Sequence, residues 1–434
     1  MNIAVIGLWH LGCVTAACLA RSGHSVLAYD ADEKLVTALQ QGKSPVFEPG
    51  LDELLSQGQH NNSLRYSFNP QDISEAEIVW VTFDTPVNEN DVADIAFVER
   101  QIDVISPYLK DHSLMLISSQ LPAGTTRKLK QKIAAQFPEK KITCGYSPEN
   151  LRLGNAIKIF TQPDRIVIGL ENEDDQEKIK ALLQMYSCNI VWMSIESAEM
   201  TKHALNAFFA LSVTFANELA ALCEKIGANA RDVEKGLKTE ERIGQKAYLR
   251  PGGAIAGGTL LRDIQYLNEM GRQKHQPTFL LSAILESNDY HKAWLHRSIV
   301  DVLTHLKNKT IAILGLTYKA NTDTLRRSSA VETCQWLHQQ GVKVHAYDPA
   351  INSLPDELEN VIDLKLTARD AIQDSDALII ATEWPQFHDE NLSDMIDTMK
   401  TPVVFDPNGF LMNKLGTDFR IQYCSVGKSY EIKK

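Results

Sequence analysis

The chain has 434 residues, 44% hydrophobic and 23% charged, which is the composition of an ordinary globular protein long enough for two or three domains. Its net charge of −11 argues against nucleic acid as a partner, so an anionic ligand must meet a local group of Lys and Arg. The seven cysteines show no C-x-x-C spacing, the chain begins with a strand pattern, and no run of about 18 apolar residues occurs. We therefore expect a reduced cytoplasmic protein with no metal site and no membrane partner.

The first predicted elements form a nucleotide-binding turn. Residues 2–6 are typical of a buried strand, residues 7–12 read G-L-W-H-L-G, and residues 13–20 are typical of a helix. The next strand ends at Asp30, where a carboxylate accepts hydrogen bonds from the ribose of NAD and repels the extra phosphate of NADP. Gly7, Leu11, Gly12 and Asp30 are the predicted cofactor contacts, and a βαβ unit that binds nothing is the alternative.

Trp9 stands where such a turn ordinarily has its second glycine. An indole opposite the pyrophosphate would hold the backbone away from NAD and weaken or shift its binding. Alternatively the ring turns away and packs, and its N–H finds a partner. The sequence leaves both interpretations open.

An internal repeat predicts the fold. The strand patterns at residues 2–8, 24–30 and 76–82 recur in the same order at 310–316, 342–348 and 377–382. Short apolar runs that alternate with helical patterns indicate βαβ units and parallel sheets covered on both faces. The expected fold class is therefore α/β, with two doubly wound, Rossmann-like domains.

Residues 196–305 lack strand signals and predict a helical core between the two repeats. Residues 196–227 indicate one long helix stopped by Gly227, with apolar residues on more than one side. Such a helix is buried. We expect it to lie between the domains and against a second subunit, and the alternative is that it forms core within one chain. Lys202 and Asn206 share one face of this helix. Asn206 could donate to an alcohol or carbonyl oxygen while Lys202 handles the proton of that oxygen or its negative charge. The alternative is that the pair forms only a solvated edge of the helix.

Two further stretches are candidate ligand loops. Residues 242–263 are rich in glycine and lead to Asp263 at a helix start, where a flexible linker and a simple N-cap are the alternatives. The C-terminal repeat inserts residues 318–329 in place of a tight turn, with Lys319, Arg326 and Arg327 as a local basic group. This group suits a diphosphate, although a solvated loop would look the same.

At these positions the chain resembles the UDP-glucose/GDP-mannose dehydrogenase family over nearly its whole length. The matching stretches are Gly7–Gly12, Gly42–Leu51, Thr85–Pro86, Pro122–Thr125, Ser147–Gly154, Pro163–Gly169, Ala198–Lys202, Asn217–Glu218, Arg242–Gly244 and Gly341–Pro349. The resemblance implies an NAD domain (residues 1–195), a helical dimerisation domain (196–305) and a nucleotide-sugar domain that binds UDP (306–434). It also implies a homodimer that serves the synthesis of surface polysaccharide or another glycoconjugate.

The resemblance implies roles for single residues as well. In this family a cysteine traps the aldehyde formed from the sugar C6 alcohol, and a second oxidation gives a thioester and then the acid. Lys202, Asn206 and Asp263 match the groups that handle proton and oxyanion, and Glu149 matches the glutamate linked to thioester hydrolysis. The implied binding residues are Thr85, Pro86 and Gln120 for the cofactor, and Arg242 (from the neighbouring subunit), Gly257, Gly258, Lys319 and Arg326 for the substrate.

The departures from the family pattern lie at positions that carry out the reaction in the family. The loop that ends G-G-S-C-x-x-K-D in the family here reads G-G-T-L-L-R-D, so Thr259 or Leu260 occupies the cysteine position. Ser118-Ser119-Gln120 replaces Lys-Ser-Thr, and Asn150 and Leu153 break a further motif. We expect a single two-electron oxidation or its reverse. The alternatives are a four-electron reaction that gives a uronic acid and a catalytically silent, sugar-nucleotide-binding regulatory protein.

Overall fold

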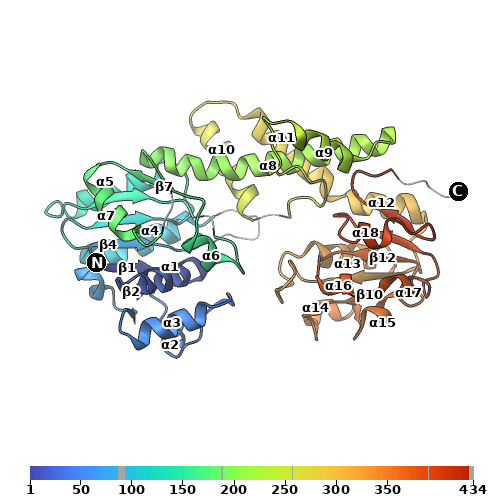
Figure 1. Cartoon of the computed structure of the whole chain (residues 1–434), viewed down its shortest axis with the longest axis horizontal. Helices are drawn as coiled ribbons and strands as arrows, with labels where there is room; N and C mark the ends of the chain where they lie inside the picture. Colours follow the sequence, from blue (N-terminus) through green and yellow to red (C-terminus); the bar gives the residue numbers. More distant parts are fainter. Residues whose placement is uncertain (87–92, 150, 187–188, 257, 390, 430–434) are drawn as a thin grey trace. The chain divides into compact units, whose positions relative to one another are not determined.

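The computed structural model describes residues 1–86, 93–149, 151–186, 189–256, 258–389 and 391–429. They form two compact units, Met1–Leu205 and Asn206–Lys434, each with its own sheet (Figure 1). The predicted α/β fold with two doubly wound sheets and a long central helix is confirmed. The predicted three-domain boundaries at 195 and 305 stay a prediction.

The N-terminal unit is built on an eight-stranded sheet with the order β3-β2-β1-β4-β5-β6-β7-β8. Its strands are β1 Asn2–Ile6, β2 Ser25–Tyr29, β3 Leu64–Ser67, β4 Ile78–Val81, β5 Leu114–Ile117, β6 Thr143–Tyr146, β7 Arg165–Leu170 and β8 Asn189–Met193. Its α-helices are α1 His10–Arg21, α2 Glu33–Gln40, α3 Leu51–His60, α4 Ile95–Ile105, α5 Thr125–Gln136, α6 Ala156–Thr161 and α7 Asp174–Leu183. Two short 3₁₀ turns, Pro70–Glu75 and Ser106–Tyr108, complete it.

Alternate residues of β1 face opposite layers, which is why this strand reads as a continuous apolar run. Ile3 and Val5 pack into a core under α1, α3, α6 and α7. Ala4 and Ile6 pack into a second core under α4 and α5. The sheet is therefore covered by helices on both faces, as Figure 1 shows.

One pairing departs from the parallel pattern. β6 and β7 are antiparallel, so β7 and β8 run opposite to the other strands of the N-terminal sheet. An apolar run looks the same whichever way the strand points, so periodicity alone carries no information on its direction.

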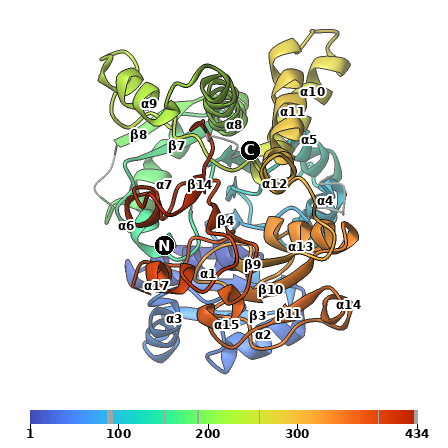
Figure 2. The same ribbon diagram turned by 90° about the vertical axis from the view of Figure 1, so that its right-hand side faces the viewer.

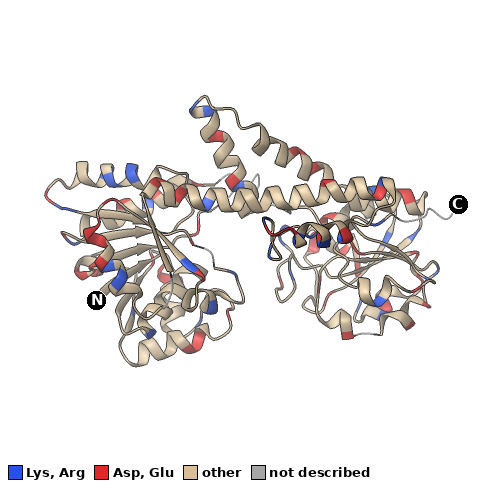
Figure 3. Cartoon of the chain, turned by 45° about the horizontal axis from the view of Figure 1, so that its top comes forward, with Lys and Arg blue, Asp and Glu red and all other residues tan. Residues whose placement is uncertain are grey.

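The long helix α8, Ile195–Ile226, runs from the first unit into the second. It stops where predicted, because Gly227 takes a left-handed conformation with φ +75°. Acidic and basic residues are interspersed elsewhere, but α8 carries no charge between Lys202 and Glu218 (Figure 3). Among the described residues it is the one helix long and apolar enough to cross a membrane, a property it shares with core helices of soluble proteins.

After α8, the described residues of the C-terminal unit form four helices before its sheet: α9 Ala230–Thr239, α10 Thr259–Gln273, α11 Phe279–Lys292 and α12 Trp294–Leu303. Helices α10 and α11 lie side by side (Figure 2). The sheet has the order β11-β10-β9-β12-β13-β14 and is entirely parallel over its described strands. They are β9 Thr310–Leu314, β10 Lys343–Tyr347, β11 Ile362–Leu364, β12 Ala377–Ile380, β13 Val403–Phe405 and β14 Gln422–Cys424.

The helices that cover this second sheet are α13 Ser329–Gln339, α14 Asp356–Glu359, α15 Ala368–Ile372, α16 Gln386–Asp389, α17 Leu392–Ile396 and α18 Met412–Leu415. Ile311 and Ile313 of β9 face one core, while Ala312 and Leu314 face the other. In both sheets the strand order changes direction next to the first strand, between β1 and β4 in one sheet and between β9 and β12 in the other. Ligands of such folds bind at the carboxyl ends of the strands at that point.

Candidate active site

The β1–α1 turn has the backbone that a dinucleotide site needs. Gly7 has φ +95°, and a Cβ there would lie 2.5 Å from the ring of Phe83. A Cβ on Gly12 would lie 1.8 Å from the carbonyl oxygen of Gly7. Leu11 is buried in the first turn of α1, whose N-terminal N–H groups favour an anionic ligand. Both glycines are therefore required by the close approach of helix and strand, and the turn fits a pyrophosphate.

Asp30 lies at the carboxyl end of β2, beside this turn. Its Oδ2 accepts a hydrogen bond from the Leu8 N–H at 2.7 Å, and its Oδ1 accepts from the Asp32 N–H at 3.0 Å. A carboxylate has about four acceptor positions, so it can still receive two ribose hydroxyls. The residues present thus fit NAD, and Asp30 also fixes the turn that would hold the cofactor.

Trp9 is the N-cap residue of α1, with φ −92° and ψ −156°. Its side chain is 47% exposed, so the indole is not packed into the core. The ring therefore stands on the surface at the start of α1, and the large residue is compatible with the turn because its backbone is extended.

The predicted cofactor residues after β4 and β5 are close together. The Thr85 hydroxyl donates to the carbonyl of Gln120 at 2.7 Å, while Pro86 is exposed beside it. Ser118, noted from the sequence only as a departure from the family pattern, accepts from the Trp80 indole N–H at 2.8 Å and donates to the carbonyl of Ser147 at 2.6 Å. It thereby ties β4 and β5 to the segment that carries Glu149.

Glu149 and Lys202 are brought together in the N-terminal unit. Lys202, on α8, is buried, and its ammonium group donates to the backbone carbonyl of Glu149. The Glu149 carboxylate accepts from the Leu151 N–H. Burial raises the pKa of the Glu149 carboxyl, while the nearby Lys202 charge opposes that rise. Such a carboxyl can accept a proton closer to neutral pH than an exposed glutamate can.

Glu199, one turn before Lys202, is a residue that sequence reasoning missed. Its buried carboxylate accepts from the N–H of Gly124 at 2.6 Å and of Thr126 at 2.9 Å, at the start of α5. The contact joins two of the quoted motifs, Pro122–Thr125 and Ala198–Lys202. Its spacing on α8 gave no signal, because Glu196 and Lys202 stand close to it in the sequence, and the two hydrogen bonds satisfy a charge that burial would otherwise leave without a partner.

In the C-terminal unit the structure pairs Asn206 with Asp263. Both are buried, and the amide of Asn206 donates to the Asp263 carboxylate. Asp263 is the fifth residue of α10, whose N-cap is Gly258, so the interpretation of Asp263 as an N-cap or first-turn residue is wrong. Because the amide N–H is committed to Asp263, the orientation of the whole Asn206 side chain is set.

The glycine-rich loop before α10 is held in place, which corrects its interpretation as a flexible linker. The N–H of Gly252 donates to Asn217 at 3.0 Å, and the carbonyl of Gly252 lies 2.8 Å from His291 Nε2. Asn288 exchanges two hydrogen bonds with the backbone of Ile255, at 2.8 and 2.9 Å. Gly257 lies outside the described residues.

The predicted substrate residues with charged side chains are exposed. Within the part of the chain that the structure describes, the Arg242 side chain pairs with its neighbour Glu240, with Nε 2.8 Å from the carboxylate. Lys319 and Arg326 are exposed on the loop between β9 and α13. This loop is anchored by Asp348, the repeat counterpart of Asp30, whose Oδ2 accepts from the N–H groups of Leu316 and Thr317 at 2.6 and 3.0 Å.

The described cysteines are structural. Cys13, Cys18, Cys144, Cys223, Cys334 and Cys424 are all buried. Burial raises the thiol pKa to about 12 at Cys13, Cys18, Cys144, Cys334 and Cys424, so these thiols stay protonated at neutral pH and are poor nucleophiles. Cys223 packs in an apolar cluster with Ala220 and Trp294.

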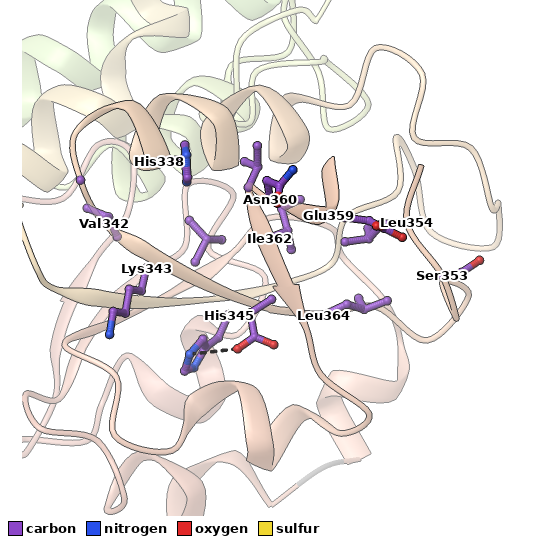
Figure 4. Close-up of a pocket in the computed structure, with 14 residues that line it drawn as sticks. His338, Val342, Lys343, His345, Ser353, Leu354, Glu359, Asn360, Ile362 and Leu364 are labelled. Carbon is purple, nitrogen blue, oxygen red and sulfur yellow. Dashed lines mark ion pairs between the residues drawn. The ribbon is translucent and has the colours of Figure 1, made fainter. Parts of the chain in front are cut away.

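A cavity of about 680 Å³ opens on the C-terminal sheet, between the end of α13 and strands β10 and β11 (Figure 4). His345 and Asp363 form an ion pair there, with Nε2 and Oδ2 3.5 Å apart. Its lining includes none of the predicted site residues. The nucleotide-sugar contacts predicted from the sequence therefore do not lie in this cavity.

Three family models match the chain in order. They are the NAD binding domain of the UDP-glucose/GDP-mannose dehydrogenase family over residues 1–187, its central domain over 196–290 and its UDP binding domain over 312–413.

Relatives and a solved structure agree with these matches. A UDP-glucose 6-dehydrogenase of Rickettsia felis is 33% identical over 100% of this chain and 97% of its own length. One of Rhizobium meliloti is 31% identical over 99% of this chain and 100% of its own length. The solved UDP-glucose dehydrogenase of Pyrobaculum islandicum is 26% identical, with a TM-score of 0.82 over 93% of each chain.

Proposed function

The chain belongs to the UDP-glucose/GDP-mannose dehydrogenase family, and from this membership we propose that it catalyses one NAD-linked oxidation of a nucleotide-sugar alcohol, or the reverse reduction. Membership makes it an NAD-dependent dehydrogenase acting on CH–OH groups, with an NAD-binding and a UDP-binding domain. The number of oxidation steps is our proposal. The observation that carries it is the segment Gly257–Asp263, which contains no cysteine.

The proposed chemistry uses three side chains. NAD, when bound, would supply the acceptor for the hydride that leaves the alcohol carbon. In its neutral amine form Lys202 takes the hydroxyl proton and becomes the ammonium, and Asn206 holds the oxygen as it becomes a carbonyl. Asp263 keeps Asn206 in one orientation through their buried hydrogen bond. Lys202 and Asn206 lie one helical turn apart on α8, so the helix fixes their spacing.

The covalent half of the family reaction needs a thiolate, which this loop cannot supply. Thr259 is the first residue of α10, and its side chain is exposed. A threonine hydroxyl attacks only when a strong base removes its proton, whereas a thiol is partly ionised near neutral pH. The reaction is therefore proposed to stop at the aldehyde.

The proposed substrate is a UDP-sugar. Lys319 and Arg326 supply positive charge for its diphosphate from the loop at the carboxyl end of β9, and Gly258 and Arg242 are the further proposed contacts. The product would enter the assembly of a surface polysaccharide or another glycoconjugate.

The proposal is tested by the stoichiometry of NADH and sugar. A thermal-shift screen of nucleotide sugars with and without NAD first selects the ligand that raises the unfolding midpoint most. With that sugar we expect one equivalent of NADH at completion. Two equivalents would establish the four-electron reaction instead, and binding without any NADH would establish a silent sugar-nucleotide-binding protein.

We predict that Asp30 makes NAD the preferred cofactor over NADP. Asp30→Asn keeps the acceptor for the Leu8 N–H but removes the charge that repels a 2′-phosphate, so NADP affinity should rise. Asp30→Ala should in addition weaken NAD, because the turn loses its hydrogen bond. Equilibrium binding of both cofactors to both variants measures this. Equal or tighter binding of NADP by the parent protein contradicts the assignment.

We propose that the protein is a homodimer formed through α8. Phe208, Phe215 and Leu222 are spaced seven residues apart and are 63%, 45% and 62% exposed in the single chain. Seven-residue spacing puts them in one stripe, the arrangement that packs against another helix. Sedimentation at micromolar concentration should show a species of twice 48.5 kDa. Phe215→Glu should give monomers, and a parent protein that sediments only as monomer contradicts the proposal.

A further inference from the structure

The turn after β13 is fixed by a buried carboxylate. Asp406 is 1% exposed, its Oδ1 accepts from the Phe410 N–H at 3.0 Å, and its Oδ2 accepts from the Leu411 N–H at 2.7 Å. The hydroxyl of Tyr423, on β14, donates to the same Oδ2. Asn408, two residues after Asp406, therefore has a set place at the carboxyl end of β13, the edge of the sheet where such folds bind ligands.

Two arginines from distant segments meet at the backbone carbonyl of Asn408. Arg231 stands in the first turn of α9, and Arg250 stands at the start of the glycine-rich loop. Each donates to this carbonyl from Nη2, and the bond from Arg250 measures 3.0 Å. A Cβ on Gly409 would lie 2.7 Å from the Arg231 Nη2, so the turn approaches this guanidinium closely. The two guanidinium groups are therefore held next to each other.

The glycine-rich loop is clamped on both sides at Gly253. Its N–H donates to the Oδ1 of Asn408 at 2.7 Å, and its carbonyl accepts from the side chain of Asn217, on α8, at 3.3 Å. A Cβ on Gly252 would lie 2.5 Å from the same Oδ1, so the loop comes this close because it has no side chain there. The exposed Arg250 side chain consequently starts from a backbone of fixed position.

These two positive charges lack a counter-charge within the part of the chain that the structure describes. Neither guanidinium forms an ion pair with a carboxylate there. Glu234, on α9, pairs instead with Lys238 at 2.7 Å, and Asp406 is committed to the turn. Burial and the neighbouring charge of Arg250 lower the pKa of Arg231. Each guanidinium has five N–H donors and spends one of them on the turn, so donors and charge remain for an anion.

We propose that Arg231 and Arg250 form a second phosphate-binding pair, which holds the diphosphate of the nucleotide sugar together with Lys319 and Arg326. The inference deepens the proposed function and rests on it. Lys319 and Arg326 lie in the loop after β9, and β13 is the second strand from β9 in the sheet, about 10 Å away. Long cationic side chains that approach a diphosphate from both sides can bridge that distance and donate to its oxygens.

The test compares UDP with uridine, which lacks the diphosphate. Isothermal titration would measure both ligands with the parent, Arg231→Gln, Arg250→Gln and the control Lys307→Gln. Lys307 is an exposed lysine before β9, at the opposite edge of the same sheet. We expect UDP to bind each arginine variant about tenfold more weakly or worse, the usual loss for a charge-assisted hydrogen bond. Uridine should bind both variants as it binds the parent, and Lys307→Gln should match the parent for both ligands.

Inorganic pyrophosphate is the third probe, because it carries the charge without the nucleoside. Its affinity should fall in both arginine variants, and in the parent it should fall as salt is added. Unchanged UDP affinity in both arginine variants overturns the pair. An equal loss for UDP and uridine also overturns it, because the arginines would then only shape the loop. A parent protein that binds pyrophosphate but not UDP overturns the proposed UDP-sugar substrate instead, whereas pyrophosphate still tests Arg231 and Arg250.

Discussion

Replacing Lys202 with Ala is expected to lower kcat by about a hundred- to ten-thousand-fold, the usual contribution of a general acid or base. The lysine is buried and held against the Glu149 backbone, so its amine has a fixed place on α8 that alanine cannot reproduce. Lys225→Ala is the matched control, because Lys225 is an exposed lysine of the same helix. It should leave kcat unchanged.

Thr259→Ala should lower kcat far less than Lys202→Ala. Thr259 is the first residue of α10 and has no chemical role in the proposed reaction. Mass spectrometry of the sugar product separates the chemistries. We expect a product about 2 mass units lighter than the substrate, the loss of two hydrogens, in the parent and in Thr259→Ala alike. A product about 14 mass units heavier that disappears in Thr259→Ala would mean that threonine forms the covalent intermediate.

Gly12→Ala is expected to give the second largest effect, on cofactor binding. The added Cβ would lie 1.8 Å from the carbonyl oxygen of Gly7 and 2.9 Å from the Thr82 hydroxyl. A backbone carbonyl cannot rotate away as a side chain can, so the start of α1 must move off β1. Overpacking of this kind costs about 1–3 kcal/mol, and a loss of about 3 kcal/mol from NAD binding corresponds to about a hundredfold weaker affinity.

The control for this change is Gly236→Ala on α9. A Cβ at Gly236 meets nothing within 4 Å, and the position is helical, so alanine should stabilise that helix by up to about 1 kcal/mol. Isothermal titration with NAD and thermal unfolding of both variants make the comparison. NAD affinity in Gly12→Ala equal to that of the parent would show that the cofactor does not use this turn.

Some of the site was predictable because it depends on neighbours in the chain. Gly7 with φ +95°, Asp30 at the end of β2 and the stop of α8 at Gly227 all follow from strand periodicity and turn chemistry. The same local information showed that Gly257–Asp263 lacks a cysteine. Local information could not show that β7 runs antiparallel to β6, because an apolar run has the same sequence pattern whichever way the strand points.

Other features depend on pairs far apart in sequence. Asp263 looked like a helix cap, and only the packing of α10 against α8 makes it the buried partner of Asn206. The glycine-rich loop looked flexible until Asn217 and Asn288 were found to hold its backbone.

The sequence by itself determined that this protein is a two-sheet α/β dehydrogenase of its family with no cysteine in residues 257–263, because strands, turns and missing residue types are local properties. The tertiary structure alone decided that Glu48 joins His10 to the Glu149 loop and that Glu199 caps α5. Those contacts satisfy buried charges, and which distant N–H groups meet a buried carboxylate is set by how the layers pack rather than by any periodicity along the chain.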